Sequence, residues 1–208
     1  VLLIGEAYQK IGMEQEAIKH YERVKRLDTN KKYADRIFLN LAKVHLSKKQ
    51  FKEAKRVAQA FINKFPRSDL IAQVLLLKAK ALTGNKEFGP AIKVYRDLLE
   101  KDLGNRSHIH YRIAQIQMNT NQPKEAVGSF NQSIKTFDRA KKPSSDHVPN
   151  AYYNYGVALY KNKNYEDAIE AFDRARKLYP VHPLNNWAEF LIADSFSKLK
   201  ELGKSIDR

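Results

Sequence analysis

Side chains that could catalyse a reaction or bind a metal are present in the chain, but they form no known catalytic pattern. Residues 203–205 read Gly-Lys-Ser, like the end of a phosphate-binding loop, yet Lys198 stands where such a loop needs its other glycine. His108 and His110 are two residues apart, so on a helix they would point in different directions and bind a metal poorly. No HExxH motif occurs, and no serine has a recognisable histidine partner. We therefore expect no enzymatic activity, no cofactor and no metal site.

The composition is that of a chain with an ordinary hydrophobic core and a basic surface. The 208 residues are 43% hydrophobic and include no cysteine, which excludes disulfide bonds and thiolate chemistry. No apolar run is long enough to cross a bilayer. The formal net charge of +15 favours acidic partners or polyanions. The basic residues are spread along the chain, so a solvated, lysine-coated helical surface is the alternative interpretation.

An alanine recurs along the chain at a nearly constant interval. The alanines are Ala17, Ala54, Ala91, Ala126 and Ala168, at intervals of 37, 37, 35 and 42 residues. The fourth residue after each alanine is aromatic or, once, alanine, and the twelfth residue before it is glycine or alanine. Five copies of this pattern indicate a stack of helical hairpins, because small residues let two helices approach each other.

Residues 149–180 show the pattern most completely and predict a helix–turn–helix. The polar stretch 161–164 separates two helical segments, and Pro180 ends the second because proline cannot continue a helix. Gly156 and Ala168 have almost no side chain, so we expect the two helices to approach closely there. The apolar stripes are Tyr152, Tyr155, Gly156 and Leu159 on the first helix and Ala168, Ile169, Phe172 and Ala175 on the second.

This unit resembles a tetratricopeptide repeat, a helical hairpin of about 34 residues. Its apolar stripes and Pro180 fill the characteristic positions of the family, with Tyr155 where an aliphatic residue is usual. The resemblance covers essentially the whole chain, although Lys78 and Gln117 depart from the pattern in other units. It implies an all-α fold in which residues 1–208 form a single right-handed superhelical solenoid of antiparallel hairpins. The expected units are about 1–31, 32–68, 69–104, 105–148, 149–182 and 183–208, the first and last incomplete.

The repeat period breaks between Ala126 and Ala168. We expect a long second helix that ends near Lys142, followed by an exposed connection through residues 141–149, which is either a functional loop or a tolerated insertion. Because the chain begins and ends within a repeat, we also expect it to be a piece of a longer protein, whose leader or membrane anchor could have been lost.

The resemblance also implies a binding surface. In the tetratricopeptide repeat family the first helix of each hairpin lines a concave groove, and its second, fifth, ninth, twelfth and thirteenth residues face the ligand. In this chain those positions are basic and aliphatic towards the N-terminus and aromatic towards the C-terminus. For Tyr153 and Tyr160, groove exposure and packing against the neighbouring hairpin are both open, and Trp187 is expected to open the sixth helix and cap the stack. The selected groove candidates are Arg36, Lys43, Lys80, Tyr111, Gln115, Asn150, Tyr153, Tyr160, Lys161 and Phe190.

These observations predict a non-enzymatic scaffold that holds a protein or peptide partner, preferably an acidic one, in its groove. The alternatives are a module that binds polyanions or polysaccharides, and a regulatory or anchoring segment of a larger protein. Specific nucleic-acid recognition is not expected, and no oligomeric state is predicted. The lysine–asparagine pair with which some family members hold a chaperone tail is absent, so that kind of docking is not expected either. Residues 61–68 resemble a joint of bacterial cell-envelope repeat proteins, which favours the bacterial periplasm or cell envelope over the cytoplasm.

Overall fold

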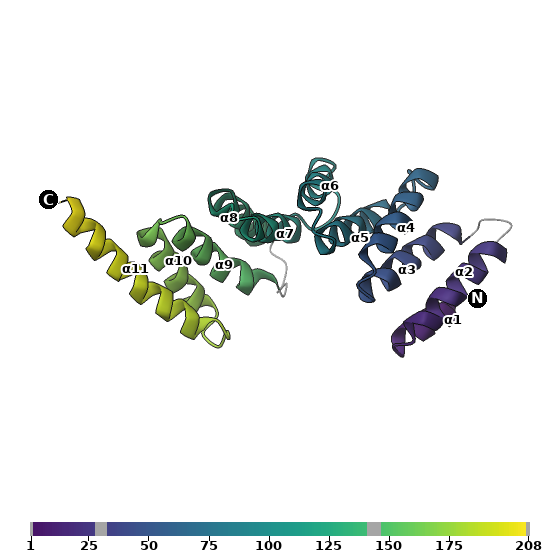
Figure 1. Ribbon diagram of the computed structural model, residues 1–208, viewed down its shortest axis with the longest axis horizontal. Coiled ribbons are helices and arrows are strands. Elements are labelled where there is room, and N and C mark those ends of the chain that lie inside the picture. The colour runs from purple at the N-terminus through teal and green to yellow at the C-terminus, as the bar shows by residue number, and fades with distance from the viewer. Residues whose placement is uncertain (1, 28–32, 141–146, 207–208) are drawn as a thin grey trace. The chain divides into compact units, whose positions relative to one another are not determined.

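The computed structural model describes residues 2–27, 33–140 and 147–206, and within these ranges it contains eleven α-helices and no strand (Figure 1). The all-α fold class predicted from the sequence is therefore confirmed. The helices are α1 Leu2–Lys10, α2 Glu14–Leu27, α3 Ala34–Ser47, α4 Phe51–Lys64, α5 Ile71–Gly84, α6 Phe88–Glu100, α7 Arg106–Asn119, α8 Pro123–Ala140, α9 His147–Lys161, α10 Tyr165–Leu178 and α11 Asn185–Ile206.

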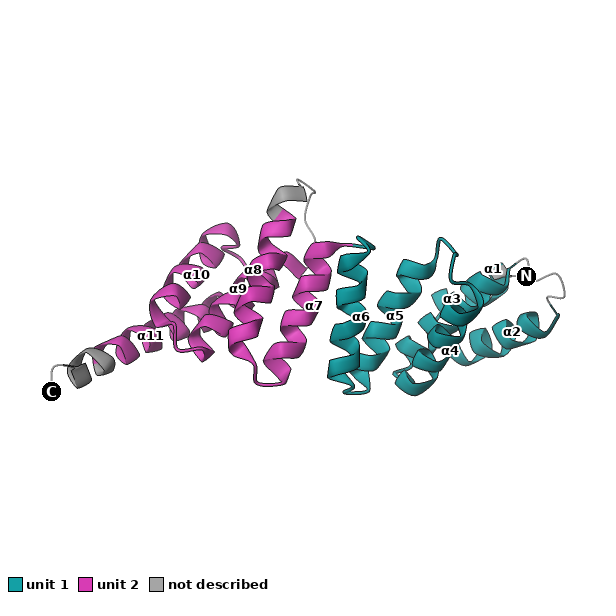
Figure 2. Cartoon of the chain, turned by 90° about the horizontal axis from the view of Figure 1, so that it is seen from above, with its two compact units in different colours: residues 1–104 teal, residues 105–208 magenta. Residues whose placement is uncertain are grey.

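The chain divides into two compact units, which Figure 2 shows in two colours. Unit 1 comprises residues 1–104 with helices α1 to α6, and unit 2 comprises residues 105–208 with helices α7 to α11. The division falls between the third and fourth repeats expected from the sequence. Inside each unit, consecutive helices pair as the repeats require, and α11 is the first helix of the sixth repeat.

The turn inside each hairpin has the same backbone conformation in all five copies. One residue per turn has a positive φ, between 56° and 75°, and it lies five residues before the recurring alanine. The next residue donates its N–H to the carbonyl five residues back, as Gln50 does to His45 at 2.8 Å and Asn164 to Leu159 at 3.0 Å. This hydrogen bond is typical of a Schellman helix end. The positive-φ residues are Gly12, Lys49, Lys86, Asn121 and Lys163.

The recurring alanine is the fourth residue of the second helix. Its N–H donates to the carbonyl four residues back, as Ala54 does to Gln50 at 2.9 Å and Ala168 to Asn164 at 3.0 Å. Both of these alanine side chains are buried. The offset of five residues from the turn to the alanine is thus the same in every hairpin, although the interval between successive alanines varies.

Glycine twelve residues before the alanine allows an aromatic ring to lie directly on the helix backbone. A Cβ atom added at Gly156 would lie 2.6 Å from Cε1 of Phe172, and one added at Gly5 would lie 2.4 Å from Cε1 of Tyr21. Both rings are buried, so they have no room to withdraw. The close approach predicted at Gly156 is confirmed.

The core of unit 1 is formed by α2, α3, α4 and the start of α5. On α4 the buried residues recur at intervals of three and four, which is the spacing of one helix face. Phe65, directly after α4, meets Phe61 and Phe38 with ring centroids 5.4 Å and 5.8 Å apart, both edge-on. This aromatic group joins α3 to the end of α4.

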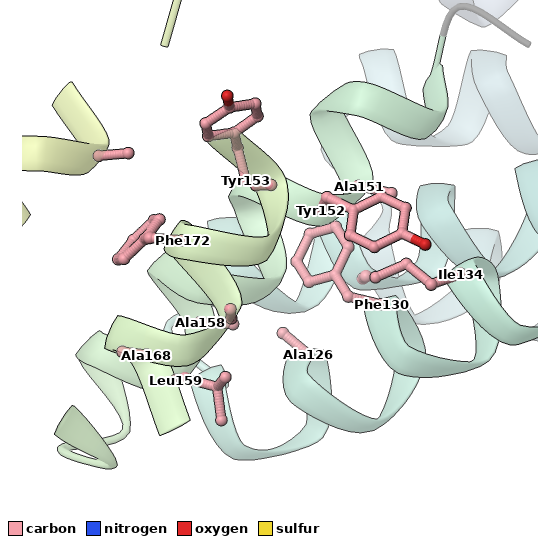
Figure 3. Packing of buried hydrophobic residues seen from close by; sticks show 14 of the residues in the cluster. Ala126, Phe130, Ile134, Ala151, Tyr152, Tyr153, Ala158, Leu159, Ala168 and Phe172 are labelled. Atoms are coloured by element: carbon pink, nitrogen blue, oxygen red, sulfur yellow. The ribbon is translucent and has the colours of Figure 1, made fainter. Parts of the chain in front are cut away.

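Unit 2 has a separate core, built from α7 to α11. Figure 3 shows Phe130 and Ile134 of α8 beside Ala151 and Tyr152 of α9, where the fourth repeat meets the fifth. Phe172 of α10 is fully buried in the same cluster. Large rings alternate with alanine, so the helices pack closely around few bulky side chains.

The predicted exposed connection at residues 141–149 overlaps the start of α9. Helix α8 is described as far as Ala140, and both the helix end expected near Lys142 and residues 141–146 lie outside the described part of the chain. Residues 147–149 belong to α9, and His147 and Val148 are buried, so the prediction of an exposed connection is wrong for them. Pro149 is compatible with this because it stands in the first turn of α9, where backbone N–H groups have no helical partner.

Candidate functional site

The positions of the first helices that the resemblance assigns to the groove are here called the groove face. The candidates selected among them fall into three groups by exposure. Arg36, Lys43, Lys80, Lys161 and Phe190 are exposed; Gln115, Asn150 and Tyr160 are half-buried; Tyr111 and Tyr153 are buried.

In unit 1 the groove face is basic over an apolar layer. Arg36 and Lys43 are two helical turns apart on α3, so their exposed side chains share one side of the helix. Leu39, the groove position between them, is buried in the unit 1 core. Lys80 is exposed on α5. Unit 1 therefore presents positive charge at these positions, while its apolar groove residue stabilises the stack.

In unit 2 Tyr111 of α7 packs against α8 and the start of α9. Its ring centroid lies 6.0 Å from that of Phe130 and 5.5 Å from that of His147. Gln115 donates from Nε2 to the Tyr111 hydroxyl at 2.9 Å, so the structure brings these two groove candidates together. Burial raises the pKa of Tyr111, and the phenol stays protonated at neutral pH. The ring itself is covered.

Tyr153 packs against the neighbouring hairpin, which is one of the two readings left open by the sequence. Only 1% of the residue is exposed, and its ring stacks on that of His182 at 4.6 Å. Its hydroxyl donates to Oδ1 of Asn185 at the start of α11, and burial raises its pKa. Tyr153 therefore fixes the position of α11 and offers its ring to no ligand.

Tyr160 forms a second link between α9 and α11. Its hydroxyl donates to Oδ2 of Asp194, and this hydrogen bond is the largest reason why the pKa of Tyr160 rises to about 12. Its ring meets that of Tyr165 at 5.6 Å, edge-on. Lys161, the next residue, is exposed. Tyr160 is half-buried, so part of it remains accessible beside the charge of Lys161.

The most exposed aromatic rings of the groove face lie on α11. Trp187 is 52% exposed and Phe190 is 57% exposed, and the two rings are stacked with centroids 5.3 Å apart and planes 20° apart. Trp187 occupies a position that the resemblance places in the groove, the second of the first helix in the sixth repeat, although capping of the stack was expected for it. Its place three residues before Phe190 puts the two residues on one side of α11, since residues three apart share a helix side.

One contact that the sequence did not predict joins a serine of α7 to a histidine of α9. Nε2 of His147 lies 2.9 Å from Oγ of Ser107, and all three members of the cluster, with Ser133, are buried. Ser107 donates its hydroxyl hydrogen to the carbonyl of Ser133 at 2.8 Å, and Ser133 donates to the carbonyl of Ser107 at 2.8 Å. We therefore assign the proton of His147 to Nε2, which donates to Ser107.

The burial of all three side chains supports a structural role for this arrangement. A histidine that activates a serine must accept the hydroxyl proton, whereas in this assignment the Ser107 hydroxyl donates its hydrogen bond to the carbonyl of Ser133. The cluster ties together α7, α8 and α9 at the point where the repeat period breaks. Ser107 and His147 are 40 residues apart in the sequence, so no local motif could indicate their contact.

Among the described residues, no three or more His, Asp or Glu side chains come together in a way that could bind a metal ion. Over the same residues, no helix combines the length and the apolar character needed to cross a membrane.

Comparison with known protein families matches three stretches of the chain to tetratricopeptide repeat models. The stretches are residues 2–31, 37–68 and 111–183. Together they cover more than half of the chain, and none of these family models describes an enzyme. A comparison with curated proteins gave no match.

Several solved structures have a similar fold at low sequence identity. The C-terminal part of a TPR repeat-containing protein from Cytophaga hutchinsonii is 17% identical, with a TM-score of 0.74 over 94% of this chain and 70% of that chain. RapI in its apo form is 15% identical, with a TM-score of 0.77 over 96% of this chain and 62% of that chain. YrrB, described as a TPR protein with an unusual peptide-binding site, is 18% identical, with a TM-score of 0.67 over 90% and 89%.

At such identities the similarity shows the fold and leaves partners and cellular location open. The fold is nevertheless shown twice, by family models that match the sequence and by structures that match the backbone. The five hairpin turns share one backbone conformation and one hydrogen-bond pattern, which agrees with a fold built from repeated hairpins. The chain belongs to the tetratricopeptide repeat family.

Proposed function

We propose that the chain is a non-enzymatic scaffold that holds a segment of a protein partner against the groove face of unit 2. The observation that carries this proposal is the stacked, exposed pair of Trp187 and Phe190. Large exposed rings are unfavourable in water, and adjacent ones mark interaction sites more often than isolated ones do. Tryptophan is also among the residues that most often dominate binding energy at protein interfaces.

The pair stands on a helix that is held in place before any partner arrives. Ala188 and Leu191 anchor α11 in the unit 2 core. Tyr153 donates a hydrogen bond to Asn185 of α11, and Tyr160 donates one to Asp194 of the same helix. Arg176 of α10 forms an ion pair with Glu189 of α11. A surface fixed in this way loses little conformational entropy on binding, which favours affinity.

The charge of the chain favours partner segments that carry acidic residues beside apolar ones. The net charge is +15, and Lys161 is exposed next to Tyr160 on the groove face. Positive charge on this face accelerates encounter with acidic segments, while the rings supply contact area. The partner we propose therefore has an apolar or aromatic side chain for the Trp187–Phe190 pair and acidic residues near it.

The test compares two variants of α11 that both remove exposed aromatic rings. Trp187→Ala combined with Phe190→Ala removes the pair, whereas Phe196→Ala removes a ring that is 58% exposed but lies outside the groove positions. Proteins captured from cells of the source organism are quantified by mass spectrometry for each chain. We expect the partner to be retained by the wild type and by Phe196→Ala and lost at least about tenfold with the double variant, because hot-spot rings contribute this much.

Circular dichroism supplies the control, since all three chains should keep the same helix content. Equal capture by the double variant and the wild type would contradict the proposal. A salt series distinguishes the polyanion alternative. Binding that falls steeply with salt and survives loss of the two rings would favour a polyanion over a protein segment.

A further inference from the structure

Unit 1 contains a pocket of about 460 Å³. It opens where the C-terminal ends of α2 and α4 meet the start of α3. Its volume lies within the range of ordinary ligand sites. The lining residues are Glu22, Lys25, Arg26, Ala34, Phe38, Lys64 and Phe65.

The floor of the pocket is aromatic and anchored in the core. Phe38 is buried in the core cluster of unit 1, and Phe65 meets it edge-on with centroids 5.8 Å apart. Phe65 also meets the fully buried Phe61, at 5.4 Å. These rings have little freedom to move, so they offer a preformed apolar surface.

Among the described residues, three cations stand around this floor. Nζ of Lys25 lies 5.1 Å and Nζ of Lys64 lies 5.4 Å from the centroid of the Phe38 ring, and Arg26 lines the same pocket. Glu22 offsets one of them through an ion pair with Lys25 at 3.2 Å. The C-terminal ends of α2 and α4 each add about half a negative charge, and the start of α3 adds about half a positive charge. Counting the described residues, an excess of about one to two positive charges therefore remains beside the aromatic floor.

We propose that this pocket binds a peptide segment of a partner protein in which an aspartate or glutamate stands beside an apolar side chain. The apolar side chain packs on Phe65, the half-buried ring of the floor, which Phe38 supports from the core, and the carboxylate accepts hydrogen bonds from Arg26 and Lys64. So small an excess of charge matches a carboxylate better than a row of phosphates, and an apolar floor contributes little to a nucleic-acid backbone. The pocket thus adds a second contact point to the scaffold, in the unit that lacks the Trp187–Phe190 pair.

The test uses the full chain labelled with ¹⁵N and short peptides with acetylated and amidated ends. The probe is Gly-Asp-Phe-Gly, with Gly-Asn-Phe-Gly and Gly-Asp-Ala-Gly as matched peptides that lack the charge or the ring. We expect the probe to shift the backbone amides of Lys25, Phe38 and Phe65, and each matched peptide to bind at least about threefold more weakly. Equal binding of the three peptides, or shifts confined to α11, would overturn the proposal for this pocket.

Two pairs of substitutions separate the pocket from general charge. Arg26→Gln with Lys64→Gln removes two lining cations, whereas Arg23→Gln with Lys52→Gln removes two exposed cations from the same helices outside the pocket. We expect the first pair to weaken probe binding about tenfold, because charge-assisted hydrogen bonds are lost, and the second to change it less than about twofold. Equal losses would show that only the overall charge matters and would refute the site.

A third variant should act in the opposite direction. Glu22→Gln removes the carboxylate that competes for Lys25, so probe binding should strengthen by about twofold or more. Weaker binding would contradict the assigned charge balance. A ten-nucleotide oligothymidylate that displaces the probe at equal or lower concentration would overturn the choice of a protein segment. The Trp187–Phe190 proposal is untouched by any of these results, since its rings lie in the other unit.

Discussion

At the scale of single residues, two aromatic side chains at the same repeat position have opposite environments. Tyr153 and Phe190 both occupy the fifth position of a first helix, yet Tyr153 is buried and Phe190 is exposed. His182 and Asn185, which follow α10, cover Tyr153. The register could be predicted from the sequence because it depends on local spacing. The burial could not, because it depends on how the following segment folds back.

Tyr153 is therefore a stability residue, and its truncation should show this. Tyr153→Ala leaves a cavity in the unit 2 core and should lower the free energy of unfolding by about 3 kcal/mol or more. Tyr153→Phe keeps the ring and loses the hydrogen bond to Asn185, so it should cost only about 1 kcal/mol. Urea denaturation followed by circular dichroism measures both. An unchanged midpoint for Tyr153→Ala would mean that the ring is not buried in solution.

At the scale of elements, the hairpin is the part of this molecule that the sequence predicted best. Its turn, its small residues and its rings lie within one repeat, so their spacing is visible in the chain. The cluster of Ser107, Ser133 and His147 was missed because three helices contribute to it. Pro149 and the serines before it suggested a loop, whereas the first turn of a helix accommodates this proline.

Two glycines of unit 2 provide a matched test of hairpin packing. Both are within helices, but a Cβ at Gly156 would lie 2.6 Å from the Phe172 ring, while one at Gly128 would meet nothing within 4 Å. Gly156→Ala should destabilise unit 2 by about 1–3 kcal/mol through overpacking. Gly128→Ala should instead stabilise it by up to about 1 kcal/mol, because alanine favours the helix.

Thermal and urea unfolding of the two variants give the sign of each change in the free energy of unfolding. The opposite signs exclude a general effect of replacing glycine in a helix. Stabilisation by Gly156→Ala would contradict the close approach of α9 and α10 at this position.

At the scale of the whole molecule, each compact unit has a core made of its own residues. The sequence predicted a series of similar repeats and contained no signal for this grouping, since the repeat pattern continues across residue 104. Repeat proteins gain stability from neighbouring repeats, so a core that is complete within one unit can be stable by itself.

We therefore expect residues 105–208 to fold as a separate chain. Trp187 is the only tryptophan of the sequence and lies in this unit, so its fluorescence reports on unit 2 alone. The free energy of unfolding of the fragment, measured in urea, should agree with that of unit 2 in the full chain to within about 0.5 kcal/mol. A fragment without cooperative unfolding would show that unit 2 depends on unit 1.

The repeated hairpin turn has a consequence for the speed of folding. Each turn joins residues only a few positions apart, and even the hydrogen bond between Ser107 and His147 spans only 40 residues. Closing such short loops has a small entropic cost, and proteins rich in local contacts fold within microseconds to milliseconds. Any of the five turns can serve as a starting point, because they are equivalent. The chain can therefore begin to fold at several places at once, one hairpin at a time.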